Sequence, residues 1–460
     1  MKIEQLSEYK GEAIIDINGS FSFQELISQI DKYTKFLLKE LNIKKSVVVI
    51  DSDYNFYSIS LLFTLLDYNC IVVPVVKTTD NEFTSKVEAS EANVIIRIND
   101  NHDLDFENLN DTAIIYDDYL TIIEKNQSGI VLFSSGTTGA PKVMVHDFNN
   151  FVESFKPPRR QKTLRFLLFL MFDHIGGLNT LINCLNNGSP IVIPENRNPS
   201  HILDIIETKK VQILPTSPTF LNLMLQVEGF ENRDLSSLKL ITYGTEKMPQ
   251  TLLDKLNVLV PNVKYLQTFG TSETGILKTQ SKNSNSLYFK IVDDNIEYKI
   301  ENNQLLIKSK TSVAGYKGLK SNKFTDDGWF ITGDLIELDD DGYMRIVGRI
   351  NDVINVGGLK VLPTEVEEVI NAIDGVFDST VFARENAITG QVVCAKIVMN
   401  KGADKAELKK LIKKSCRQRL DRYKNPVKII LTDTIEFTTR FKKKIIPTKI
   451  WAFQLLTQLK

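Results

Sequence analysis

Residues 130–146 read IVLFSSGTTGAPKVMVH, an apolar run that opens directly into a loop of small and hydroxylated residues. Small side chains let backbone N–H groups approach phosphate oxygens, while hydroxyls and a lysine add donors and positive charge. The Gly-Lys-Ser/Thr ending of a Walker loop is missing, which weakens a kinase or P-loop ATPase interpretation. We predict a phosphate-binding loop after a buried strand, with these candidate residues: Ser134, Ser135, Gly136, Thr137, Thr138, Gly139 and Lys142.

The chain around this loop alternates short apolar runs with helical patterns. Runs such as 46–51 (SVVVID) are continuously apolar, and residues 23–41 have the period of an amphipathic helix. Continuous apolar strands between helices are typical of parallel sheets covered on both faces. From about residue 288 the runs become short and alternating, which favours antiparallel strands. We expect an α/β fold with a large N-terminal body of mostly parallel sheets flanked by helices plus a β-rich subdomain (1–349), and a smaller α+β C-terminal domain (350–460).

Composition excludes several classes of protein. The 460 residues carry 56 Lys+Arg and 57 Asp+Glu, so no overall field attracts nucleic acid or an acidic membrane. Residues 401–460 hold 17 Lys/Arg against 5 Asp/Glu, a local balance of +12 that leaves −13 on the rest of the chain. The four cysteines are scattered, and no apolar run reaches the roughly 20 residues of a membrane helix. The acidic, polar start has no secretory signal, and we expect a cytoplasmic protein.

Further motifs follow the loop in a fixed order. They read YGTEKMP at 243–249, QTFGTSETG at 267–275, WFITGDL at 329–335, GRIND at 348–352 and GGLK at 357–360. Together with the loop they resemble the adenylate-forming superfamily, which includes acyl-CoA and aryl-CoA ligases, nonribosomal adenylation domains and beetle-type luciferases. The resemblance covers nearly the whole chain and implies ATP, Mg²⁺ and a mobile C-terminal lid domain.

The resemblance implies a role for most of these residues. Phe269 would pack against adenine, Ser272 would reach the α-phosphate, and Glu273 would be the Mg²⁺ ligand and a catalytic residue. Asp334 would accept hydrogen bonds from the ribose hydroxyls beside Arg349, for which a carboxylate is well suited. The remaining candidates for nucleotide or thiol binding are Tyr243, Gly244, Thr245, Glu246, Thr268, Gly270, Thr271, Ile346 and Lys360.

The chain departs from the family pattern at several positions. Val143 and Thr245 stand where relatives usually have glycine, and Asn351 stands at the domain hinge where they have Asp or Lys. The catalytic lysine of relatives follows a glycine that is missing from 438–446 (TTRFKKKII). The apolar pattern after it favours Lys444, whereas counting from the preceding threonine favours Lys443.

Residues 172–177 (FDHIGG) belong to the acid-binding end. Aligned on His-x-Gly-Gly they resemble acyl- and aryl-CoA ligases, with His174 near the substrate carboxylate. Aligned on Phe-Asp they resemble amino-acid adenylation domains, in which Asp173 would hold the substrate ammonium. The first match is longer, so we prefer a carboxylic acid without an α-amine.

The resemblance implies two half-reactions: formation of an acyl-adenylate with release of pyrophosphate, then transfer to a thiol with release of AMP. Coenzyme A is the default acceptor, and the phosphopantetheine of a separate carrier protein is the alternative. A phosphotransferase that leaves ADP and a degenerate nucleotide-binding protein are the alternatives of another class.

Overall fold

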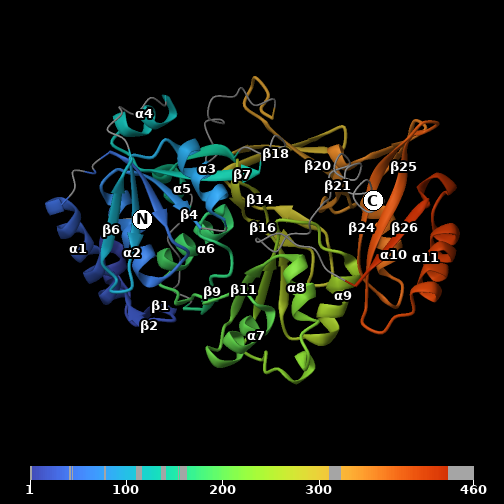
Figure 1. Cartoon of the computed structure of the whole chain (residues 1–460), viewed down its shortest axis with the longest axis horizontal. Helices are drawn as coiled ribbons and strands as arrows, with labels where there is room; N and C mark the ends of the chain where they lie inside the picture. The colour runs from blue at the N-terminus through green and yellow to red at the C-terminus, as the bar shows by residue number, and fades with distance from the viewer. Residues whose placement is uncertain are drawn as a thin grey trace, which may run out of the picture.

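The computed structural model describes residues 3–40, 43, 45–76, 79–109, 117–135, 141–153, 155, 163–309 and 323–433. Gly136, Thr137, Thr138, Gly139 and the candidate lysines 443 and 444 lie outside these ranges. In Figure 1 the blue-to-cyan part of the chain lies at the left, the green part in the middle, the yellow-to-orange strands β18 and β20 above it, and the orange-to-red C-terminal part at the right.

The first region is a six-stranded sheet with parallel strands at its centre. Successive side chains of a central strand are buried on opposite faces of the sheet. Val48 and Ile50 pack toward α1 and α2, while Val47 and Val49 pack toward α3 and α4. This two-sided burial explains the continuous apolar runs of the sequence. The strands, in sheet order, are β6 (Leu104–Asn108), β5 (Val94–Ile98), β3 (Val47–Asp51), β4 (Ile71–Val75), β7 (Gly129–Ser135) and β8 (Pro141–Asp147). The helices are α1 (Phe23–Glu40), α2 (Phe56–Asp67), α3 (Asp80–Ser90), α4 (Asp117–Glu124) and α5 (Phe148–Glu153), after a 3-10 turn at Ile3–Glu8.

The second region is a seven-stranded sheet that is parallel except for one terminal hairpin. Its order is β13 (Lys264–Gln267), β12 (Leu240–Tyr243), β11 (Ile213–Thr216), β9 (Phe166–Leu167), β10 (Ile191–Val192), β1 (Glu12–Asp16) and β2 (Gly19–Ser22). The helices of this region are α6 (Ile175–Asn186), α7 (Pro199–Thr208), α8 (Pro218–Met224) and α9 (Gln250–Leu259), with a 3-10 turn at Phe230–Asn232.

An antiparallel region follows, as the alternating sequence predicts. The hairpin of β14 (Phe269–Thr271) and β15 (Gly275–Leu277) leads into a six-stranded sheet. That sheet has the order β16 (Thr279–Ser281), β17 (Phe289–Ile291), β21 (Met344–Arg349), β20 (Phe330–Leu338), β19 (Gln304–Ser309) and β18 (Ile296–Glu301).

The C-terminal region builds a core of its own. Val366 and Ile370 of α10 pack with Ile397 and with Ile412 of α11 in one hydrophobic cluster. The strands are β23 (Leu359–Val361), β22 (Ile354–Val356), β25 (Gly390–Met399) and β24 (Val376–Asn386), with β26 (Lys428–Thr432) parallel to β25. The helices are α10 (Pro363–Asn371) and α11 (Lys405–Arg419), with 3-10 turns at Ile350–Asp352 and Arg422–Lys424. The α/β body, the β-rich part and the α+β end expected from the sequence are thus confirmed.

Contacts between described residues join this region to the body. The Nζ atom of Lys247 lies 2.9 Å from Oε1 of Glu368 on α10, and the hydroxyl of Thr364 donates to the carbonyl of Val347 at the end of β21. Among the described residues, no helix has the length and apolar character needed to cross a membrane.

Candidate active site

Two of the predicted motifs meet where parallel strands β12 and β13 end. Tyr243 and Gln267 are partners in the β12–β13 register, and Thr268 donates from its backbone N–H and its hydroxyl to the Tyr243 carbonyl at 2.8 and 3.1 Å. A Cβ on Gly244 would lie 2.5 Å from Oγ1 of Thr268, so this position accepts only glycine without rearrangement. Loops at the carboxyl ends of parallel strands are the usual ligand sites of such sheets.

The turn after β12 is held in a strained conformation. Thr245 has φ +70°, a left-handed value that is an outlier for a β-branched residue. The carboxylate of Glu246 accepts the backbone N–H of Thr219 at 2.8 Å, so it caps the first turn of α8. The sequence assigned Glu246 to the nucleotide, and the structure adds this positioning contact.

The β14–β15 hairpin presents Glu273. A Cβ on Gly270 would lie 2.4 Å from the Gly275 carbonyl, so only glycine allows the two strands to approach this closely. The hydroxyl of Thr271 accepts the backbone N–H groups of Glu273 and Thr274, both at 3.2 Å, and thereby fixes the turn. Phe269 is buried and stacks on Phe289 with 6.1 Å between ring centroids.

Glu273 is a buried carboxylate with a cation beside it. Its side chain is 8% exposed, and Nζ of Lys323 lies 3.0 Å from its Oε1 atom. His146 of β8 is buried near Glu273. Burial lowers the pKa of His146 to about 4 against the attraction of Glu273, so the imidazole is neutral at pH 7.

This arrangement brings Glu273 to the strand that leaves the phosphate loop. Ser134 and Ser135 end β7 and pair with Lys142 and Pro141 at the start of β8, so the loop connects an antiparallel pair. His146, opposite Ile130 at the other end of this strand pair, is the residue of β8 that lies near Glu273. The structure therefore unites the 243–246 turn with the 267–275 motif, and it places Glu273 near the strand that follows the phosphate loop.

The predicted ribose pair lies on adjacent strands. Asp334 of β20 and Arg349 of β21 are partners in the sheet register, and Nε of Arg349 donates to Oδ1 of Asp334 at 3.0 Å. Asp334 is buried while the arginine side chain is 60% exposed. Burial raises the pKa of Asp334, and Arg349 opposes that rise. Ile346 lies on β21 opposite Ile336 and packs against the same sheet core.

The hinge and thiol-side candidates lie on the exposed face of the C-terminal region. Asn351 is exposed within the 3-10 turn Ile350–Asp352 that directly follows Arg349. Lys360 is exposed on β23, opposite Asn355. Gly357 and Gly358, with φ of +60° and +89°, form the turn between β22 and β23.

The acid-side motif forms the loop between β9 and α6. His174 is the N-cap of α6, and its Nδ1 atom accepts the backbone N–H of Gly176 at 3.0 Å. Nε2 is therefore the nitrogen that carries the proton and can donate to a carboxylate. A Cβ on Gly177 would lie 2.3 Å from the Met171 carbonyl, so the loop folds tightly over the start of the helix.

A buried lysine that the motifs do not contain neutralises Asp173. Nζ of Lys86, on α3, lies 3.1 Å from Oδ2 of Asp173 and 2.9 Å from Glu82. The side chains of Lys86 and Asp173 are 5% and 2% exposed. The only sequence signal is that position 86 shares the helical face of Val87 and Ser90, which are also buried.

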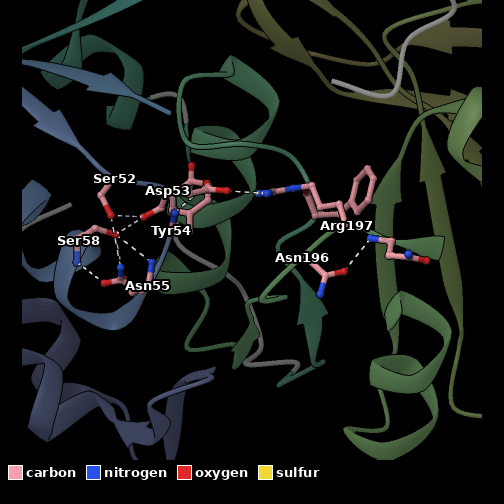
Figure 2. A network of polar contacts seen from close by, with 9 residues as sticks. Ser52, Asp53, Tyr54, Asn55, Ser58, Asn196 and Arg197 are labelled. Carbon is pink, nitrogen blue, oxygen red and sulfur yellow. Dashed lines mark hydrogen bonds and ion pairs between the residues drawn. The ribbon is translucent and has the colours of Figure 1, made fainter. Parts of the chain in front are cut away.

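A second ion pair, between Arg197 and Asp53, is also tied to this loop (Figure 2). Arg197, after β10, contacts Asp53 at 2.5 Å through Nη1 and donates from Nε to the Phe169 carbonyl at 2.5 Å. The ring of Tyr54 packs on Phe172 with 4.5 Å between centroids. Residues from the first sheet thus fix the loop that carries His174.

The comparisons with known proteins agree with this geometry. The chain is 25% identical over 360 residues to a 2-succinylbenzoate–CoA ligase of Listeria innocua, covering 74% of this chain and 73% of the relative. It is 28% identical over 326 residues to a long-chain-fatty-acid–CoA ligase of Mycobacterium tuberculosis, covering 66% of this chain and 64% of the relative.

The fold is shared with solved structures. A crystal structure of an anthranilate CoA ligase in complex with anthranoyl-AMP superposes with a TM-score of 0.77 at 19% identity, covering 100% of this chain and 97% of the other. The model of AMP-binding enzymes matches residues 4–307, and that of the AMP-binding enzyme C-terminal domain matches residues 365–442. Because the first match alone covers more than half of the chain, the chain belongs to the family of AMP-binding enzymes, as its resemblance to the adenylate-forming superfamily implied.

Proposed function

We propose that this enzyme activates a carboxylic acid with ATP to an acyl-adenylate and then transfers the acyl group to coenzyme A, giving an acyl-CoA and AMP. The observation that carries the proposal is the meeting of the 243–246 turn and the motif that carries the Glu273 hairpin at the carboxyl ends of β12 and β13. Membership of the AMP-binding family and the CoA ligases among its relatives support the same reaction.

The polar and charged residues of the site account for nucleotide binding. Asp334, held by Arg349, would accept hydrogen bonds from the ribose hydroxyls. Glu273 fits Mg²⁺, because it offers carboxylate oxygens and the structure already places the cationic group of Lys323 against one of them. When bound, Mg²⁺ would spread the charge of the phosphates. The loop N–H groups, its hydroxyls and Lys142 would hold the same phosphates.

The proposed reaction has two steps. A carboxylate oxygen of the acid attacks the α-phosphorus, and the bond to the leaving pyrophosphate breaks. The thiolate of coenzyme A next attacks the acyl carbon, so that a thioester forms and AMP leaves with the bonding electrons. We assign the Nε2–H group of His174 to the substrate carboxylate, because its tautomer makes that nitrogen a donor.

The Lys86–Asp173 pair favours an acid without an α-amine. A substrate ammonium that bound Asp173 would have to displace a lysine whose side chain is 5% exposed. Breaking a buried pair is costly, because it leaves an uncompensated charge. This contact supports the His-x-Gly-Gly alignment over the Phe-Asp alignment. We therefore propose that the substrate is a carboxylic acid without an α-amine.

The lid function of residues 350–460 belongs to the same proposal. Asn351 would be the pivot, since it lies exposed in the short turn after the ribose arginine. Lys360 would line the thiol path, and Lys444 would bridge the carboxylate and the α-phosphate. Lys444→Ala should abolish adenylation but spare thioester formation from supplied acyl-adenylate; the same selective loss in Lys443→Ala alone would move the role by one residue.

The deciding experiment measures pyrophosphate release with Mg-ATP and a panel of aliphatic, aromatic and amino acids, with and without coenzyme A. Release with acids lacking an α-amine, stimulated by coenzyme A, is the expected result. Release without that stimulation would favour a carrier-protein thiol. ADP formation, or no release with any acid, would contradict the proposal. The four buried, unpaired cysteines suit the reducing cytoplasm, where we place the enzyme.

A further inference from the structure

Lys323 belongs to no recognised motif, yet it contacts the candidate metal ligand. Its backbone carbonyl accepts the N–H of Ile331 at 2.7 Å, which ties it to β20, the strand of Asp334. Its Nζ atom lies 5.7 Å from the centre of the Phe330 ring and 3.0 Å from Oε1 of Glu273. The backbone is thus fixed, while the long side chain spans the distance to the carboxylate.

The two partners differ greatly in exposure. The Glu273 side chain is 8% exposed, whereas that of Lys323 is 53% exposed. A carboxylate taken out of water needs a compensating positive charge or several hydrogen bonds. Lys323 supplies a positive charge 3.0 Å from Oε1, and about half of its side chain faces solvent.

Magnesium would compete for the same oxygen atoms. Mg²⁺ binds oxygen ligands at about 2.0–2.1 Å and brings two positive charges. An ammonium 3.0 Å from Oε1 would then lie within a few ångströms of the ion and repel it. An ammonium on Oε1 and a Mg²⁺ ion on the same carboxylate therefore weaken each other's binding.

We infer that Lys323 is the resident counter-cation of Glu273 in the nucleotide-free enzyme and that Mg²⁺ with its nucleotide displaces it. The inference rests on the proposed function, which makes Glu273 the metal ligand. It predicts that the lysine stabilises the empty site and weakens divalent-metal binding, because the metal must displace the lysine in order to bind.

The test compares Lys323→Gln with wild type by electron paramagnetic resonance of Mn²⁺, titrated in the presence of α,β-methylene-ATP. Removing a half-exposed competing charge should lower the Kd for Mn²⁺ by about 2- to 5-fold. Without metal or nucleotide, the melting temperature of the variant should fall, and the added ligands should close that gap. Lys210→Gln is the matched control, because Lys210 pairs with Asp234 on the surface, has a 58% exposed side chain like that of Lys323, and should change neither quantity.

Other results of these measurements would overturn the inference. Unchanged or weaker Mn²⁺ binding in Lys323→Gln would overturn the inference while leaving the proposed function intact. Weaker nucleotide binding in metal-free buffer would also overturn it, by showing that the lysine contacts phosphate instead. Failure of wild type to bind Mn²⁺ with the nucleotide, or equal binding by Glu273→Gln, would overturn the inference and the metal role of Glu273 together.

Discussion

Replacing Lys86 by methionine tests how the acid-side loop is held. The substitution keeps the length of the side chain but removes the ammonium 3.1 Å from Asp173, and the two side chains are 5% and 2% exposed. Glu82 loses the same partner, but its side chain is 46% exposed and can turn to water. Removing one member of a buried ion pair typically costs about 3–5 kcal/mol, and we expect Lys86→Met to lose that much stability.

The second variant separates charge from packing. Lys86→Met combined with Asp173→Asn removes both buried charges, and such a replacement is often close to neutral. The double variant should therefore recover to within about 1 kcal/mol of wild type, a coupling of at least about 2 kcal/mol. Urea unfolding of the single and double variants measures both values.

Kinetics supply an independent readout of the same pair. Because Asp173 precedes His174 in the loop, Lys86→Met should raise KM for the acid more than KM for ATP. A loss below about 1 kcal/mol, or a double variant as unstable as the single one, would refute the buried-pair reasoning.

Three further predictions concern the nucleotide side. Burial raises the pKa of Asp334, so its ionisation opposes folding above the usual Asp range. Asp334→Asn should therefore raise the melting temperature at pH 7, lose this advantage as the pH falls to the usual Asp range, and abolish AMP binding in calorimetry. Thr245→Gly should stabilise the fold by roughly 1 kcal/mol in urea titration, because it relieves a φ of +70°; a loss of stability would contradict that strain. Gly270→Ala should destabilise it by about 1–3 kcal/mol, since its Cβ would lie 2.4 Å from the Gly275 carbonyl; an unchanged unfolding midpoint would rule out the close approach.

Much of the fold follows from local pattern. The continuous run 46–51 corresponds to the buried parallel strand β3, and the alternating run at 296–300 lies within the antiparallel strand β18. The amphipathic pattern at 23–41 corresponds to helix α1, Phe23–Glu40. These elements are predictable because a period of two or 3.6 residues is a property of neighbouring positions.

Part of the site could also be predicted from the sequence. Small residues, hydroxyls and carboxylates at fixed spacings pointed to nucleotide chemistry, and the structure pairs Asp334 with Arg349 across two strands. The order of these motifs along the chain, not any single motif, carried the resemblance to adenylate-forming enzymes, and the family match confirmed it.

By itself, the sequence determined the class of fold, the order of the motifs and the kinds of group that face the nucleotide. Only the tertiary structure decided which charges meet. Lys86 and Asp173 are 87 residues apart, and Lys323 and Glu273 are 50 residues apart. No local period links such positions, because their distance depends on how separate sheets and loops pack. The neutralisation of Asp173 by Lys86 and the pairing of Glu273 with Lys323 are therefore properties of the folded chain alone.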